Sequence, residues 1–305
     1  PASEPALFGG RALTYYGRWT YKYSEAARRG AAAVILVHTD ESAGYPWGVV
    51  RSSNGGQRFD LELDAKSAEQ ALALRSWVTE DAARRLLRLA DRELEPLAAA
   101  AATRDFRPID LGLTARVRLK SETRTVRSSN VAGILRGRDP KLAGEYVVVS
   151  AHWDHLGIGE PNAAGDAVYN GAVDNASGVG GMLAIAEALS KARPKRSVLF
   201  LATTAEEQGL LGAKWWTEHP TVPIGKVVAN VNLDPMNVEA LVDDIVPLGA
   251  DRSTLEKDVA AIAKERKLAV TPDPRPDQGT FYRSDHLPFA RLGIPAISLK
   301  TGTHY

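Results

Sequence analysis

A scattered set of histidine and acidic side chains in this chain could hold metal ions. These residues are His152 and Asp154 in AHWDH, Asp174 in GAVDNASG, Glu206 and Glu207 in TTAEEQG, Asp234 in VNLDPMN, and His304 in KTGTH. Imidazole nitrogens and carboxylate oxygens are the ligands that catalytic zinc sites use, with one position left open for water. The residue types therefore predict a hydrolase with a pair of zinc ions.

Charge balance favours two zinc ions over one. Asp174, Glu207 and Asp234 supply negative charges that two zinc ions and one bridging hydroxide would neutralise. A single zinc would leave buried carboxylates unpaired, which is costly. Asp154 lies two residues after His152, on the same side of an extended backbone, so we expect its carboxylate to accept the second ring N–H of His152 and to orient the ring.

Most of these residues follow apolar runs rich in β-branched side chains. The runs span residues 146–152, 197–207, 227–234 and 294–304. In an open α/β sheet the carboxyl ends of the strands meet at one crevice, so ligands that are distant in sequence can converge there. Helical periodicity follows Asp174, with Ser177 as the expected N-cap, and recurs near 210–218 and 254–267. The pattern predicts an α/β fold, a three-layer α/β/α domain with a mainly mixed sheet.

The N-terminal region has a different organisation. A helix at 23–29, a strand at 33–37 and a strand at 72–79 are expected, followed by a helical stretch at 80–102 that Pro96 should interrupt. We place the domain boundary near residue 80, which gives a smaller, β-rich domain at 1–79 and a catalytic domain at 80–305. Within the second domain, further strands are expected at 112–120 and 129–136.

Composition excludes few classes of function. Lys plus Arg (38) nearly equals Asp plus Glu (37) without a long basic run, so a nucleic-acid partner is not expected. No apolar run reaches the roughly 18 residues of a membrane span, and the chain reads as soluble. The absence of cysteine excludes thiol catalysis and thiolate metal sites. The oligomeric state stays open.

The ordered motifs resemble one enzyme family. AHWDHLG, DNASGVGG, AEEQGLLGA, NLD, RSDHLPFARLGIP and GTH resemble family 28 of the metallopeptidases, the di-zinc aminopeptidases. The resemblance covers residues 106–305, which would be truncated at the C-terminal end, and residues 8–79 resemble part of a protease-associated domain. Members act on peptide substrates, and a secreted or periplasmic location is implied.

The resemblance implies a role for each site residue. His152 and Asp234 would bind one zinc, Glu207 and His304 the other, and Asp174 would bridge them through a loop with an unusual, cis peptide bond after it. Glu206 would be the general base for a zinc-bridging hydroxide, and Asp154 the orienting acid. Tyr282 would stabilise the oxyanion, with Phe281 an equally close match in register.

Several readings compete with these assignments. A glutaminyl cyclase shares this fold and ligand set but works with one zinc, and the transferrin receptor branch of the family is non-catalytic. His155 is expected to pack or form a hydrogen bond rather than bind metal. Asp285 and His286 are expected to support the pocket structurally, since the five ligand positions are already filled.

Overall fold

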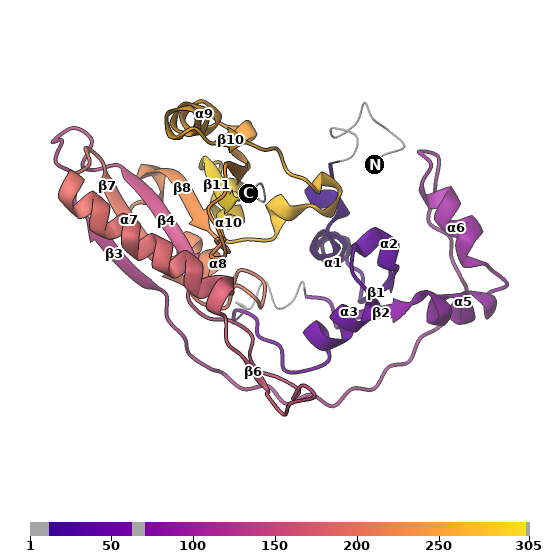
Figure 1. Ribbon diagram of the computed structural model, residues 1–305. Helices are drawn as coiled ribbons and strands as arrows, with labels where there is room; N and C mark the ends of the chain where they lie inside the picture. The colour runs from indigo at the N-terminus through magenta and orange to yellow at the C-terminus, as the bar shows by residue number, and fades with distance from the viewer. Residues whose placement is uncertain (1–11, 63–70, 303–305) are drawn as a thin grey trace. The chain divides into compact units, whose positions relative to one another are not determined.

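The computed structural model describes residues 12–62 and 71–302, which fall into two compact units (Figure 1). Of the described residues, 12–13, 59–62 and 127–302 belong to the larger unit, and 14–58 and 71–126 belong to the smaller. The predicted boundary near residue 80 lies inside the smaller unit. There, Thr79 both ends β2 (Leu74–Thr79) and caps α5 (Glu80–Arg88), because its side chain accepts a hydrogen bond from the amide of Ala82.

The larger unit is built on a mixed sheet of seven strands in the order β10-β9-β11-β8-β4-β7-β3. The strands are β3 (Val131–Leu135), β4 (Tyr146–His152), β7 (Ser197–Thr203), β8 (Val227–Leu233), β9 (Asp244–Leu248), β10 (Ala269–Val270) and β11 (Ala296–Thr301). Strands β7, β4, β8 and β11 are parallel, whereas β3 and β9 pair antiparallel to their neighbours β7 and β11. The carboxyl ends of the four parallel strands therefore lie along one edge of the sheet.

Helices cover both faces of this sheet. The helices of the unit are α7 (Gly178–Ala192), α8 (Leu211–Glu218), α9 (Leu255–Arg266) and α10 (His286–Arg291). Side chains alternate along β4, so Val148 packs with Trp216 of α8 and Phe289 of α10, while Val149 packs with Met182 of α7 on the other face. Figure 1 shows α7 lying along the sheet beside β4 and β7. The predicted three-layer α/β/α architecture is confirmed.

Short elements complete the larger unit. They are the hairpin strands β5 (Gly157–Ile158) and β6 (Val168–Tyr169), and the helical turns η2 (Ala172–Ser177), η3 (Ile224–Lys226), η4 (Ala250–Arg252), η5 (Pro276–Gln278) and η6 (Thr280–Tyr282). No helix within 12–62 and 71–302 is long and apolar enough to cross a lipid bilayer.

The smaller unit has a two-stranded parallel sheet, β1 (Ala33–His38) with β2, among its described residues. The helical elements are η1 (Tyr15–Gly17), α1 (Trp19–Arg28), α2 (Asp40–Ala43), α3 (Trp47–Asn54), α5 and α6 (Leu94–Ala101). The rings of Trp19, Tyr23 and Trp77 pack edge to face, and the Tyr23 hydroxyl donates to the carbonyl of Ser76 at 2.8 Å. The assignment of this unit to a protease-associated domain stays a prediction.

Two local predictions are corrected. The strand expected at 112–120 does not form, and Leu113, Val117 and Leu119 are 46%, 53% and 69% exposed. A strand needs a partner edge, which an apolar pattern by itself does not supply. The helical stretch is interrupted at 89–93, ahead of Pro96, which lies in the first turn of α6 where its missing N–H leaves no helical bond unmade.

Candidate metal centre

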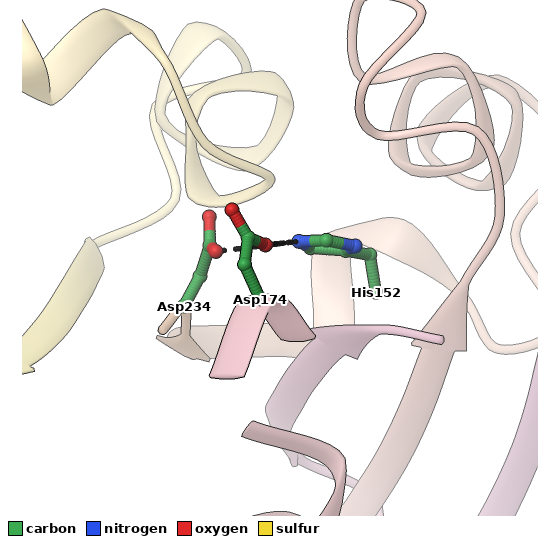
Figure 2. A group of neighbouring side chains, drawn as sticks. All are labelled: His152, Asp174 and Asp234. Carbon is green, nitrogen blue, oxygen red and sulfur yellow. Dashed lines mark hydrogen bonds and ion pairs between the residues drawn. The ribbon is translucent and has the colours of Figure 1, made fainter. Parts of the chain in front are cut away.

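Three of the predicted ligands converge at the carboxyl edge of the sheet. His152 is the last residue of β4, Asp234 directly follows β8, and Asp174 lies in η2. Figure 2 shows the two carboxylates beside the imidazole: His152 Nε2 lies 3.0 Å from Asp174 Oδ1 and 3.3 Å from Asp234 Oδ1. The three donor atoms lie within 4.8 Å of one another, as a single cation requires.

Asp174 also belongs to a second group of donors. This group consists of His155, Asp174 and Glu207, with one ligand atom from each residue and all three atoms within 4.8 Å of one another. A further group consists of His152, Glu206 and Glu207. Asp174 is therefore shared between a group with His152 and a group with Glu207. A carboxylate that bridges two cations needs this arrangement. His304 lies outside the described residues.

The backbone after Asp174 fixes the position of this shared carboxylate. The peptide bond between Asp174 and Asn175 is cis, as the resemblance implied. The buried Asn175 side chain donates to the carbonyl of Leu233 at 2.9 Å and accepts from the amide of Gly178 at 3.1 Å. A Cβ at Gly178 would lie 2.3 Å from Asn175 Oδ1 and 2.5 Å from the Leu233 carbonyl oxygen, so only glycine fits there. These contacts join the Asp174 loop to the end of β8.

Ser177 does not cap α7 with its side chain, contrary to the sequence-based expectation. Its hydroxyl donates to the carbonyl of Val173 at 2.6 Å and accepts from the amide of Met236 at 2.9 Å. The helix is preceded by the turn η2 rather than by an extended residue, so the capping geometry is absent. Ser177 instead joins the Asp174 loop to the chain after Asp234.

The orientation of the His152 ring comes from a backbone carbonyl and not from the Asp154 carboxylate. His152 Nδ1 lies 2.8 Å from the carbonyl oxygen of Asp154. The Asp154 carboxylate instead accepts from Thr204 Oγ1 at 2.8 Å and from the amide of Ala205. Strand β4 ends at His152, so the alternation that placed both side chains on one side does not extend to Asp154. Asp154 thereby holds the loop that carries Glu206.

A buried chain of hydrogen bonds, absent from the sequence-based prediction, positions Asp234. Asn230 donates to Ser150 Oγ at 2.9 Å, Ser150 to Asn232 Oδ1 at 2.8 Å, and Asn232 to Ser284 Oγ at 2.6 Å. Ser284 in turn donates to Asp234 Oδ2. All five side chains are buried. The one available signal was the recurrence of polar residues at alternate positions in VVANVNLD, a strand that is otherwise apolar.

The electrostatics of the site favour a cation. Burial raises the pKa of Glu206 well above its usual range, as do the nearby charges of Asp285 and Asp234. Burial and the charge of Asp174 likewise raise the pKa of Glu207. Burial lowers the pKa of His152, but the neighbouring carboxylates of Asp174 and Asp234 outweigh that effect and raise it to about 12.

The pKa of Asp234 is shifted in the opposite direction, below its usual range. Burial raises its pKa, but hydrogen bonds from His152 and Ser284 outweigh burial and lower it. Asp174 Oδ1 is buried and makes no well-aligned hydrogen bond, although His152 Nε2 is 3.0 Å away. An excess of carboxylates over bases and an orphaned carboxylate oxygen fit a bound metal ion.

The predictions for the residues between 281 and 286 have different outcomes. Tyr282, in η6, receives a hydrogen bond from Arg252 Nη1 at 3.4 Å, and its role toward an oxyanion stays a prediction. Phe281 is buried, with its ring 4.7 Å from that of His286. Asp285 is fully buried and accepts from Thr203 Oγ1, at the end of β7. These contacts agree with the supporting role expected of Asp285 and His286.

The sequence model of Peptidase family M28 matches residues 130–305, more than half of the chain. The chain belongs to peptidase family M28. All of the described donor residues lie within the matched range, so the family resemblance that the motifs indicated is confirmed.

Individual relatives of this M28 chain match over shorter stretches. A probable zinc metalloprotease of Pyrenophora teres f. teres is 34% identical over 110 residues, which are 36% of this chain and 23% of that protein. A vacuolar membrane protease of Kluyveromyces lactis is 35% identical over 99 residues, 32% of this chain and 10% of that protein. The chain thus spans less than a quarter of the length of either relative. An aminopeptidase from Aneurinibacillus sp. strain AM-1 shares the fold, with a TM-score of 0.51 and 20% identity over 94% of this chain and 58% of its own.

Removing the last donor of the buried chain should destabilise this M28 domain. Ser284→Ala leaves Asp234 Oδ2 without its donor and Asn232 Nδ2 without its acceptor. We expect a loss of about 1–3 kcal/mol in the free energy of unfolding, measured by urea denaturation in the presence of a chelator. The control is Ser190→Ala, whose hydroxyl is exposed on α7. An unchanged midpoint for Ser284→Ala would show that water replaces the lost partners.

The pH dependence of stability should carry a contribution from His286. Burial lowers the pKa of this ring from 6.5 to about 3, so between these values the unfolded chain takes up a proton that the folded protein does not. The stability present above pH 6.5 is therefore lost as the pH falls toward 3, by up to about 1.4 kcal/mol per pH unit. His286→Phe should flatten the stability curve over this window.

The contribution of His286 is measured as the difference in the free energy of unfolding between variants. Burial raises the pKa of Asp285 to about 7, which makes stability fall as the pH rises and opposes the His286 contribution below pH 6.5. Chemical denaturation of wild type, His286→Phe and the exposed control His219→Gln at several pH values isolates the His286 part. Equal slopes for wild type and His286→Phe would refute the prediction.

Proposed function

We propose that the chain carries the catalytic unit of a zinc-dependent aminopeptidase. The observation that supports this most strongly is the sharing of Asp174 between two donor groups, with the buried carboxylate of Glu206 beside them. In this proposal His152 and Asp234 hold one zinc ion, Glu207 and His304 hold the other, and Asp174 contacts both. When bound, zinc would polarise the scissile carbonyl and lower the pKa of a water molecule.

Glu206 is the general base in this mechanism. It is adjacent to the ligand Glu207, and its side chain is buried with only 9% of its surface exposed. Its carboxylate would accept a proton from water and later donate that proton to the leaving amine. Proton transfer of this kind requires a fixed carboxylate, and the Asp154 carboxylate fixes the loop that bears Glu206 by accepting from Thr204 and Ala205.

Two further interactions, with the oxyanion and with the N-terminus of the peptide substrate, complete the proposed mechanism. Tyr282, whose hydroxyl oxygen accepts from Arg252, would donate its O–H to the developing oxyanion. Carboxylates near the metals would hold the free α-ammonium of a peptide, which would make the enzyme an exopeptidase. A secreted or periplasmic location stays a prediction.

Metal analysis and substrate assays test this function together. The purified chain should bind two zinc ions per molecule and release the chromophore from aminoacyl p-nitroanilides. N-acetylated versions of the same substrates should react far more slowly, because they lack the α-ammonium. Binding of one zinc together with cyclisation of N-terminal glutamine would favour the glutaminyl cyclase alternative. Absence of any hydrolysis with two zinc ions bound would reject the peptidase proposal.

A further inference from the structure

His155 faces the metal centre from the loop after β4. It follows Asp154 directly, and its side chain is 20% exposed, but its Nδ1 atom is buried. This nitrogen lies 2.8 Å from Glu207 Oε1. His155, Glu207 and Asp174 form the second donor group described above, so the imidazole lies where the second cation would be held.

The contact between His155 and Glu207 has the distance of a hydrogen bond without its direction. Nδ1 makes no well-aligned hydrogen bond, although Glu207 Oε1 is 2.8 Å away. Hydrogen bonds weaken steeply when the N–H points away from the acceptor. Asp174 Oδ1 is in the same situation beside His152. Donor atoms that approach one another without pointing at one another are typical of ligands directed at a common third position.

The surrounding chain holds the His155 ring in this place. Gly171 has a positive φ of 67°, and a Cβ there would lie 2.8 Å from His155 Cβ and 3.0 Å from the carbonyl oxygen of Asp174. Gly171 thus allows the loop bearing Asp174 to approach the loop bearing His155. The ring of Tyr169, in β6, packs edge to face against His155 with centroids 6.4 Å apart. These contacts restrict the imidazole before any ion is bound.

We propose that His155 Nδ1 is a ligand of the cation held by Glu207 and Asp174, in addition to the ligands that the family resemblance implied. This rests on the proposed function only in requiring two bound cations. Neutral imidazole suits zinc, and a nitrogen donor beside two carboxylates gives a mixed ligand set typical of that metal. The expectation that His155 only packs or forms a hydrogen bond would then be replaced.

Two substitutions separate a ligand from a hydrogen-bond partner. His155→Ala removes the ring, whereas His155→Asn puts an amide N–H near the position of Nδ1 and can still donate to Glu207. The matched control is His219→Ala, because His219 stacks on Trp215 on the exposed surface of α8. Titration of the metal-free 305-residue chain with Zn²⁺ against a competing chelator gives the affinity of each ion.

We expect both His155 variants to bind one of the two ions more than about 100-fold less tightly than wild type, a loss beyond the roughly 10- to 100-fold typical of outer-shell partners. The other ion should bind with unchanged affinity, which also shows that the variants are folded. In wild-type protein labelled with ¹⁵N-histidine and loaded with ¹¹³Cd²⁺, the His155 Nδ1 resonance should show coupling to cadmium.

Several outcomes would overturn the assignment. Wild-type affinity for both ions in His155→Asn would make the ring a hydrogen-bond partner only, and absence of ¹¹³Cd coupling at Nδ1 would do the same even if His155→Ala failed to fold. Binding of one cation by wild type would also refute it. Peptide hydrolysis by wild type is measured separately. Cadmium coupling without hydrolysis would reject the proposed function and support His155 as a ligand. Hydrolysis without coupling would reject His155 as a ligand and support the proposed function.

Discussion

Glu206→Gln is expected to lower kcat/KM by about 10²- to 10⁴-fold while the zinc content stays that of wild type. Glutamine has nearly the same shape as glutamate but cannot accept the proton, and Glu206 is not among the proposed ligands. Because burial raises the pKa of this carboxylate, a neutral amide in its place should not destabilise the metal-free fold. Steady-state kinetics on an aminoacyl p-nitroanilide, with metal analysis of the same sample, measures both quantities.

Two comparisons make the Glu206 result interpretable. Glu187→Gln, on the exposed surface of α7 where Glu187 pairs with Lys191, should leave both activity and zinc unchanged. Glu207→Gln should lose activity together with metal, because a ligand is removed. If Glu206→Gln kept activity within a few-fold of wild type, another group would have to accept the proton.

Asp174→Asn is expected to weaken both zinc ions and to abolish activity as a consequence. The carboxylate is shared between a donor group with His152 and Asp234 and a donor group with His155 and Glu207. An asparagine removes the negative charge that would attract both ions. We expect each zinc to bind more than about 100-fold less tightly, since loss of a ligand should exceed the effect of an outer-shell change.

Zinc titration against a competing chelator measures this effect for each ion separately. Asp258→Asn, on the exposed face of α9, is the matched control and should bind both ions normally. The bridging assignment would be wrong if Asp174→Asn retained two tightly bound ions. Loss of one ion alone would place Asp174 in a single site.

Local sequence patterns determined the elements that carry the site. Strands β7 and β8 lie within the runs 197–207 and 227–234 singled out in the sequence, because largely apolar runs bounded by turn residues are strong signals for buried strands. The ordered motifs also indicated the family, and strand-end positions predicted that His152 and Asp234 would meet, as their 3.3 Å approach shows. The sequence did not predict β9 or α10. Each contains a proline, Pro247 in β9 and Pro288 in α10, and proline normally argues against both strands and helices.

Only the tertiary structure decided how side chains are used once the chain leaves a strand. The Asp154 carboxylate holds the Glu206 loop rather than the His152 ring, because alternation ends with β4. Likewise, the hydrogen-bonded path through Asn232 and Ser284 joins positions 52 residues apart. Such contacts depend on sheet order and loop paths, which local periodicity does not encode. The sequence by itself therefore determined which residues reach the edge of the sheet, and the fold decided which atoms point at one another.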